Sequence, residues 1–558
     1  MNSLLLRAMP LAMCLALGQP GVSQVTPAPL PAQQPAHLSA EQWREDLAFM
    51  AAEMKRRHAN LHHSVSSQEF EAAVADLHAR IPVMQRNEIV VGLMSLAAMI
   101  GDGHTRVDPR KDPKFGFPSL PLKLYLFEDG LFVRAARPDY ATLVGAEVVE
   151  IGGVPVAEAI RRTQAISSID NVIGYKKFAP IYLNMPDILH ALKLSGSRDS
   201  AVLKLRQAGQ TRTVTVPAGQ IDPLWPPDTD VSLVTPEGWT DARAAPQPLW
   251  LQAPLDYHRL IALPGQKALY AQINMITGID GQSLTQFGEK IRRQAEAMNP
   301  RAVIFDVRLA HGGNHDLRFG LIRELIKAED DDTQLFVLTG RGAYSATEAL
   351  LVDFDRLTKA TLVGEPASSK PNSYGDSYRT PLPNSGISVR TSIQFNQLRG
   401  QSRDPWTWVD VATPYTFADY ASGRDPALSA ALAFEPEATL TDRLKKVASP
   451  ADARRLVEEY AADPRKRFAD QERQMLIAAE TVGAGKHSEI ALAVAEVAAA
   501  RFPRSHDAQL VFAFLLERAG RTAAAVEAAR RALAIDPDSR QGRSLLERVQ
   551  KQAAPISP

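Results

Sequence analysis

The sequence predicts an α/β protein: a core with a parallel sheet, an N-terminal helical segment, a small β-rich segment and an all-α C-terminal segment. Three observations carry this prediction. Apolar runs of strand length alternate with helical patterns between residues 268 and 365, a 34-residue period appears near the C-terminus, and helical periodicity fills residues 40–100. Strands that alternate with helices of this length usually pair in parallel through right-handed crossovers.

The composition is that of an ordinary globular protein. The chain has 558 residues, of which 45% are hydrophobic and 23% are charged, and its formal net charge is zero. This length allows roughly three or four domains. Because the chain is neutral and has no long basic run, we expect neither nucleic acid nor an anionic membrane to be its main partner.

Residues 1–23 are expected to be a secretory signal peptide. A basic residue precedes a short apolar stretch and small residues follow it, so cleavage is expected after Gly18 or Ser23. A lipoprotein signal at Cys14 is the weaker alternative, because the bulky Met13 precedes it. Cys14 is the only cysteine, so an exported chain would have no disulfide, which suits a bacterial periplasm.

Residues 24–39 form a tether rich in proline, alanine and glutamine, and residues 40–105 form the N-terminal helical segment. Three helical patterns occupy this segment: "AEQWREDLAFMAAEMKRRH", "SQEFEAAVADLHARI" and "RNEIVVGLMSLAAMI". The apolar run from Ile89 to Ile100 is too short to cross a bilayer, so no membrane span is expected in the mature chain.

The β-rich segment covers residues 106–218, and strands are expected to dominate it from Pro121 onward. Within it, "EVVEIGGVPV" predicts a hairpin on the glycine pair at Gly152. Residues 219–248 hold six prolines and predict a linker or a long surface loop.

Residues 249–435 are expected to form the α/β core. Strands are expected in "ALYAQINMI", "AVIFDV", "QLFVLT" and "ATLVG", and helices in "SLTQFGEKIRRQAEAM", "DLRFGLIRELIKA" and the run that follows "GRGAY". Three loops follow the strand C-termini: Arg308–Asn314, Gly340–Ser345 and Glu365–Asn372. Open α/β sheets bind their ligands at that edge, so a functional site is expected there.

Ser345 stands where a strand gives way to a helix in "LTGRGAYSATEALLVDF". Ser345 and Glu348 fit a capping box, which would make the serine a helix cap. Alternatively, the hydroxyl lies beside the unpaired N–H groups of the helix start, where an oxyanion can be held. The shared edge of the three loops favours the second interpretation.

A serine nucleophile needs a base for its proton and donors for the developing oxyanion. Three residues compete as the base: His104 in "GDGHT", Lys370 in "SSK", and His311 before a double glycine. The donors expected are the N–H of Ala346 and one N–H of the turn at Gly312. A histidine on a loop is more often only polar surface, so these residues alone leave the base open. Glycines separate His311 from the next histidine, so no metal site is expected.

The chain resembles a known family through five motifs in order: "GDGHT", "AVIFDVRLAHGGN", "GRGAYSATE", "LVGEPASSK" and "SGRDPAL". They resemble the tail-specific, or C-terminal processing, serine peptidases, most closely the tricorn-like branch. The resemblance covers roughly residues 41–432. It implies a ClpP/crotonase-like core, cleavage of peptides or proteins through an acyl-enzyme, and no cofactor. The stretch "LVGAEVVEIGGVPV" weakly resembles the end of a PDZ domain.

The resemblance implies a role for each candidate residue. Ser345 takes the position of the nucleophile, Gly312 and Ala346 those of the oxyanion donors, and His104 that of the base of tricorn-like members. Lys370 matches the lysine of the Ser-Lys members. The acid that orients the histidine is expected late in the core, and the candidates are Asp404 and, behind it, Asp410.

Three departures from the family pattern bear on these roles. Ala310 replaces the usual asparagine of the oxyanion loop and favours the rival hypothesis, a peptidase-fold protein with an inactive site that binds a peptide or an apolar ligand. Gly375 stands where Ser-Lys members have glutamine, and Pro371 replaces a usual glycine. Both count against Lys370, so His104 is the expected base.

Residues 436–558 are expected to form helical repeats. Pro503 and Pro537 stand 34 residues apart, and small residues share this offset. The pairs are Ala479 and Ala513, Ala491 and Ala525, Ala495 and Ala529, and Ala498 and Ala532. The pattern resembles tetratricopeptide repeats, which would recruit a protein partner. The alternative is an alanine-rich helical bundle.

Overall fold

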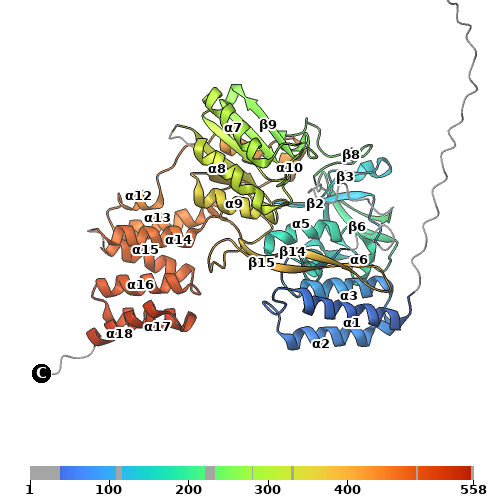
Figure 1. Ribbon diagram of the computed structural model, residues 1–558, viewed down its shortest axis with the longest axis horizontal. Coiled ribbons are helices and arrows are strands. Elements are labelled where there is room, and N and C mark those ends of the chain that lie inside the picture. Colours follow the sequence, from blue (N-terminus) through green and yellow to red (C-terminus); the bar gives the residue numbers. More distant parts are fainter. Residues whose placement is uncertain are drawn as a thin grey trace, which may run out of the picture. The chain divides into compact units, whose positions relative to one another are not determined.

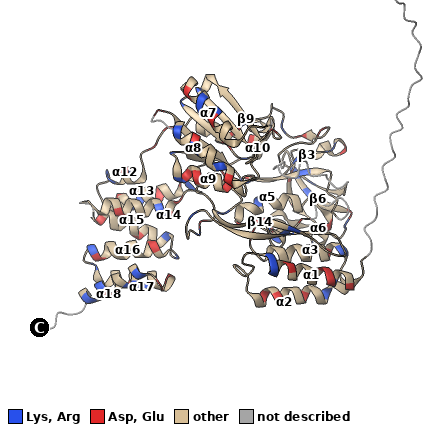
Figure 2. Cartoon of the chain, viewed as in Figure 1, with Lys and Arg blue, Asp and Glu red and all other residues tan. Residues whose placement is uncertain are grey.

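The computed structural model describes residues 38–108, 116–219, 233–279, 281–328, 332–485 and 488–553 (Figure 1). The expected signal peptide, most of the tether and part of the Pro-rich linker lie outside the described residues. Within the described ranges, none of the helices has both the length and the apolarity needed to cross a bilayer. Basic and acidic residues are interspersed over the helices and strands of the described residues (Figure 2).

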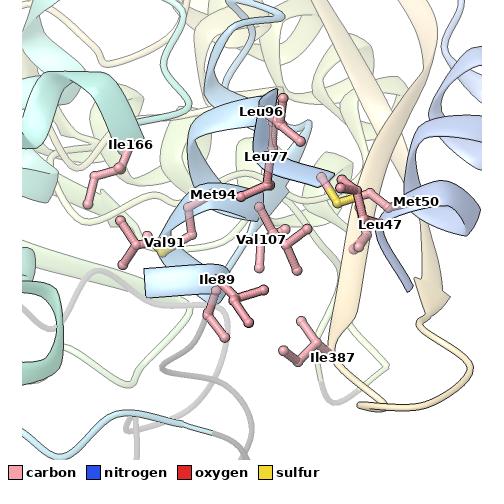
Figure 3. Close-up of a cluster of buried hydrophobic side chains, with 14 of the residues drawn as sticks. Leu47, Met50, Leu77, Ile89, Val91, Met94, Leu96, Val107, Ile166 and Ile387 are labelled. Carbon is pink, nitrogen blue, oxygen red and sulfur yellow. The ribbon is translucent and has the colours of Figure 1, made fainter. Parts of the chain in front are cut away.

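The three expected N-terminal helices are confirmed as α1 (Ala40–Arg57), α2 (Ser67–Arg80) and α3 (Arg86–Ala98). Serine capping boxes start α1 and α2. Their apolar faces meet in one buried cluster that includes Leu47, Leu77 and Met94 (Figure 3). Val107 belongs to the same cluster, so the loop between α3 and the following strand is anchored at both ends.

The β-rich segment contains an antiparallel sheet with the strand order β2-β3-β4-β6-β7, in which β5 pairs with β4 and β8 with β3. The strands are β2 (Leu122–Phe127), β3 (Gly130–Ala136), β4 (Glu147–Ile151), β5 (Val154–Pro155), β6 (Ser200–Gln207), β7 (Gln210–Pro217) and β8 (Thr240–Asp241). The expected hairpin is confirmed, because Ile151 pairs with Val154 around two glycines with φ of 58° and 78°. Positive φ at both positions is what a type I′ turn requires.

The sequence predicted that strands dominate this segment from Pro121 onward, but helices occupy part of it. Three helices separate β5 from β6: α4 (Val156–Thr163), α5 (Val172–Tyr182) and α6 (Pro186–Ala191). Asn171 caps α5 by accepting the N–H groups of Ile173 and Gly174. This cap matters for the site, since the residue before it, Asp170, lies against the loop that carries His104.

The α/β core contains a six-stranded sheet with the order β16-β13-β12-β11-β10-β9. The strands are β9 (His258–Leu263), β10 (Ala268–Ile273), β11 (Ala302–Asp306), β12 (Gln334–Thr339), β13 (Thr361–Gly364) and β16 (Val411–Ala412). All neighbours pair in parallel except β9, which is antiparallel to β10. The parallel pairing expected for the four central strands is confirmed.

Helices pack on both faces of this sheet. One face packs against α7 (Leu284–Met298), α8 (Arg318–Ala328) and α9 (Ala346–Leu357), and the other against α11 (Pro426–Leu432). The strands are apolar on both sides, as buried parallel strands must be. The three loops that follow β11, β12 and β13 therefore reach one edge of the sheet.

A third sheet was not expected from the sequence. β14 (Asn372–Pro381) and β15 (Ser388–Gln397) form an antiparallel hairpin, and β1 (Arg106–Val107) pairs with β15. Because β1 directly follows the "GDGHT" loop and β14 directly follows the Lys370 loop, this sheet holds two loops that are distant in sequence beside each other.

The described residues of the C-terminal segment form helices joined by short connections. Its helices are α12 (Leu440–Leu444), α13 (Pro450–Ala462), α14 (Gln471–Gly483), α15 (Ser488–Arg501), α16 (His506–Arg518), α17 (Thr522–Ile535) and α18 (Arg540–Ala553). In the core, before this segment, the short helix α10 (Phe417–Ala421) precedes α11. Consecutive helices pack against each other in pairs (Figure 1). All eight alanines that share the 34-residue offset are fully buried, which is the reason that small residues recur there.

Candidate active site

Ser345 occupies the start of α9 with an unusual backbone. Its φ is 57° and its ψ is −122°, and its side chain makes no capping hydrogen bond. The capping box does not form, because the Glu348 carboxylate accepts hydrogen bonds from the backbone N–H and the hydroxyl of Thr407 instead. A non-glycine residue with positive φ costs about 1–3 kcal/mol and is typical of functional sites. The hydroxyl is therefore available for another partner.

That partner is His104. Its Nε2 lies 3.1 Å from Ser345 Oγ, although the two residues are 241 positions apart in the sequence. On the other side of the ring, Nδ1 lies 2.9 Å from the Tyr344 hydroxyl. The His104 and Tyr344 rings also stack, with centroids 4.7 Å apart. The structure thus joins the expected serine and the expected histidine and adds a tyrosine that the sequence had not indicated.

Asp102 fixes the loop that carries His104. Its Oδ1 accepts the backbone N–H groups of His104 at 2.8 Å and Thr105 at 2.6 Å, and its Oδ2 lies 2.9 Å from His58 Nε2. Burial raises the pKa of Asp102, but hydrogen bonds from His58 and Ser392 outweigh it and lower the pKa to about 2. The carboxylate of the "GDGHT" motif therefore holds the loop backbone and does not face the His104 ring.

The His104 imidazole is neutral at neutral pH. Burial, followed by the nearby positive charge of Arg106, lowers its pKa to about 4, although Asp102 opposes the shift. A neutral ring can accept the proton of the Ser345 hydroxyl at Nε2, as a general base must.

Glycines bring the oxyanion loop against the serine. A Cβ on Gly312, whose φ is 121°, would lie 3.0 Å from Ser345 Cβ, and one on Gly313 would lie 2.3 Å from the Ile276 carbonyl oxygen. Only glycine fits at either position. Among the described residues, the N–H groups of Gly312 and Ala346 donate to no protein acceptor. These two N–H groups are therefore available to donate to an oxyanion beside the Ser345 hydroxyl.

The departure at Ala310 does not open this loop. Its carbonyl accepts the N–H of Tyr344 at 3.1 Å and the hydroxyl of Thr347 at 3.0 Å, and its side chain is fully buried. Both hydrogen bonds are accepted by the backbone carbonyl of residue 310, which is the same group in alanine and in asparagine.

An open cavity of about 530 Å³ lies in front of the serine. Its lining includes four of the candidate residues, Ser345, His104, Ala346 and Lys370. The other lining residues are Gly313, Asn314, His315, Asp316, Glu348, Ala349, Ser373, Asp376, Gln394, Asn396 and Leu398. Within the described residues, no hydrogen bond joins Lys370 to Ser345. The third candidate base, His311, stacks on Tyr344 and has its Nδ1 3.2 Å from Lys177 Nζ.

The placement expected for Asp404 does not occur. Its carboxylate lies 3.6 Å from Arg399 and lines a separate cavity, because the nearby guanidinium attracts it. Asp410 is also turned away, since its carboxylate accepts the N–H of Leu362. Tyr344 occupies the position at His104 Nδ1 that the acid was expected to take.

Two further residues position the site, and sequence reasoning missed both. The Asn171 amide donates to the carbonyls of Ala367, Ser369 and Pro405, which fixes the loop after β13. Asp170 accepts the backbone N–H of Gly103 at 2.9 Å. An asparagine before a helical pattern is a recognisable cap, but nothing in "SSIDN" indicates contacts to distant loops.

Comparisons with known proteins find only solved structures, all at low similarity. No family model matches the chain, and no curated protein matches it. Among solved structures, the S499A mutant of CPAF has a TM-score of 0.48 at 13% identity, over 68% of this chain and 94% of that one. Mature CPAF complexed with lactacystin has a TM-score of 0.45 at 14% identity, over 68% and 95%. The photosystem II D1 C-terminal processing protease has a TM-score of 0.32 at 13% identity, over 69% and 98%. Likenesses of this size do not establish an activity.

No group of histidine, cysteine, aspartate and glutamate side chains in the described part of the chain is arranged to hold a metal ion.

Proposed function

We propose that the chain is an exported, periplasmic serine peptidase that cleaves peptide or protein substrates. The observation that carries this proposal is the 3.1 Å approach of His104 Nε2 to a Ser345 hydroxyl that is held at a strained helix start and not used as a cap. The family resemblance of the five motifs supports a peptide bond as the substrate.

The reaction follows from the groups at the site. Ser345 Oγ attacks the substrate carbonyl while His104 Nε2 takes its proton, which forms a tetrahedral oxyanion. The N–H groups of Gly312 and Ala346 stabilise that oxyanion, and one such donor typically contributes about 3–4 kcal/mol. His104 then passes its proton to the leaving amine, and water, activated by the same ring, releases the acyl group from Ser345.

In this proposal Tyr344 takes the orienting role expected of Asp404. If His104 donates its Nδ1–H to the tyrosine oxygen, its Nε2 has no proton and can act as the base. A neutral hydroxyl holds the ring in place but stabilises the imidazolium less than a carboxylate would.

Replacing Tyr344 by phenylalanine is expected to lower kcat by about 3- to 10-fold with little change in KM, which is the effect of losing one neutral hydrogen bond. Phenylalanine keeps the stacking on His104, so the fold should be unaffected. Steady-state kinetics on a peptide substrate measure the effect, and Tyr140→Phe, in the β-rich segment, is the control. An unchanged kcat for Tyr344→Phe would remove the tyrosine from the mechanism.

A serine-directed fluorophosphonate tests the proposal itself. The wild-type chain should be labelled, and mass spectrometry should locate the adduct on Ser345. A properly folded wild-type chain that is never labelled would instead support the rival hypothesis, a binding protein with the same fold and an inactive site. Labelling that persists in Ser345→Ala would place the nucleophile elsewhere.

The C-terminal helices are proposed to be tetratricopeptide-like repeats that dock a protein partner. The burial of every alanine at the 34-residue offset supports this assignment, because close helix crossings need small residues.

A further inference from the structure

The backbone of Ser345 needs support from its surroundings. Its φ of 57° and ψ of −122° lie in a region that glycine adopts more readily than serine. Such a conformation persists only where neighbouring contacts fix it. The Ser345 side chain does not supply that support, because its hydroxyl lies beside His104 and makes no capping hydrogen bond. Hydrogen bonds to the backbone itself must therefore hold the residue in place.

Two of these hydrogen bonds are local. The Thr347 N–H donates to the Tyr344 carbonyl at 3.1 Å, and the Glu348 N–H donates to the Ser345 carbonyl at 2.9 Å. Both donors stand at the start of α9. These bonds therefore move with the segment and do not fix it relative to the rest of the core.

A third hydrogen bond reaches a different part of the core. The Ser345 N–H donates to Ser369 Oγ at 3.0 Å, across 24 positions of sequence. Ser369 lies in the loop that follows β13, whereas Ser345 follows β12, and these two strands are neighbours in the sheet. The bond therefore ties the backbone of the proposed nucleophile to a separate loop.

Ser369 is itself held in place. It is fully buried, and its carbonyl accepts the Asn171 amide at 2.9 Å. The residue before it, Ser368, donates its N–H to the Ala343 carbonyl at 3.0 Å. These contacts fix the Ser369 hydroxyl relative to the turn that carries Ser345.

The Ser345 backbone orients two groups of the proposed reaction. Rotation about its φ moves the hydroxyl away from His104 Nε2, and rotation about its ψ turns the planar peptide group that carries the Ala346 N–H. Both groups have to stay in place, since a displacement of about 1 Å in a reacting geometry costs about 100-fold in rate.

We propose that Ser369 is a positioning residue of this site, whose hydroxyl accepts the Ser345 N–H and thereby holds the nucleophile in its positive-φ conformation. That conformation keeps Ser345 Oγ beside His104 and the Ala346 N–H in place to donate to the oxyanion. This role rests on the proposed function, and it adds a residue that acts on the backbone of the nucleophile and not on its hydroxyl.

The rate of fluorophosphonate labelling of the full chain, measured over a range of reagent concentrations, tests this role. Ser369→Ala removes the acceptor and should lower the maximal rate per folded molecule by about 10- to 30-fold, part of the loss expected for a misplaced nucleophile. The half-saturating concentration should change by less than about 2-fold, because Ser369 is not among the described residues that line the cavity. A substitution that only loosened the fold would change the fraction of folded molecules and not the rate of each.

Ser368→Ala is the matched control for the alanine variant. It removes the hydroxyl of the neighbouring buried serine, which donates to the Ala343 carbonyl. Its labelling rate per folded molecule should stay close to that of the wild type.

Threonine and valine at position 369 separate the effect of the hydroxyl from that of side-chain shape. The two side chains have nearly the same shape, but only threonine keeps an oxygen that can accept the Ser345 N–H. Any crowding by the added methyl group affects both variants alike, so Ser369→Thr should label about 10-fold faster than Ser369→Val. This pair also serves if Ser369→Ala folds poorly.

Thermal unfolding tests the same role without any activity. Glycine tolerates the backbone conformation of residue 345 and alanine does not, so Ser345→Gly should melt about 2–4 °C above Ser345→Ala. When Ser369→Ala is added to each variant, residue 345 is free to relax and the difference should disappear.

Three results overturn this role and leave the proposed function intact. They are a wild-type maximal labelling rate in Ser369→Ala, equal rates in the threonine and valine variants, and a melting difference between Ser345→Gly and Ser345→Ala that persists when Ser369→Ala is added. A wild-type chain that is not labelled contradicts the proposed function instead, while the melting temperatures still report on the backbone of residue 345.

Discussion

Replacing Ser345 by alanine is expected to lower the rate of peptide hydrolysis by about a million-fold, the loss typical of removing a serine nucleophile. The hydroxyl makes its side-chain hydrogen bond with His104 and does not cap α9, so its removal should cost the fold about 1 kcal/mol or less. Steady-state kinetics and thermal unfolding of the same preparation measure both quantities.

Ser368→Ala is the matched control for this variant. Ser368 is a buried serine in the loop after β13, and its hydroxyl donates to the Ala343 carbonyl rather than to a reacting group. It should lose some stability and keep most of its activity. If Ser345→Ala kept activity within 10-fold of the wild type, residue 345 would not be the nucleophile.

Replacing His104 by alanine is expected to reduce fluorophosphonate labelling by at least about 10⁴-fold, whereas Lys370→Ala should reduce it by less than about 10-fold. The difference follows from geometry, because His104 Nε2 contacts Ser345 Oγ and Lys370 only lines the cavity. Removing a triad histidine costs nearly as much as removing the serine.

Free imidazole added to the labelling reaction provides a further test of His104 as the base. The alanine variant leaves the space of the ring empty, so free imidazole should restore part of the labelling in His104→Ala and none in Ser345→Ala. If Lys370→Ala were the inactive variant and His104→Ala the active one, the base would be the lysine.

The sequence predicted the core well because its signals are local. Continuous apolar runs of strand length indicated the four central strands, and a period of 3.6 indicated the helices α7–α9 and the three N-terminal helices. The β14–β15 hairpin was missed because its strands are largely polar and partly exposed, and they are held in place by contacts with α1 and β1 that are distant in sequence. The helices α4–α6 were missed in a segment whose flanking strands dominated the pattern.

Some residues of the candidate site could likewise be predicted from the sequence, and others could not. Ser345, His104 and Gly312 stand in short motifs, so the sequence could indicate them. The partner of His104 Nδ1 could not be found that way, because it depends on which side chain reaches the ring after folding. Asp404 was a candidate for the orienting acid because it stands late in the core. In the structure its carboxylate lies beside Arg399, and Tyr344, the residue before Ser345, reaches the His104 ring instead.

The measurement that tests the central claim most directly is a crystal structure of the chain after reaction with a peptidyl phosphonate. The account predicts a covalent bond from phosphorus to Ser345 Oγ, His104 Nε2 still beside that oxygen, and a phosphonyl oxygen about 2.7–3.1 Å from the backbone nitrogens of Gly312 and Ala346. An adduct on another residue, or a phosphonyl oxygen that points away from both N–H groups, would contradict it.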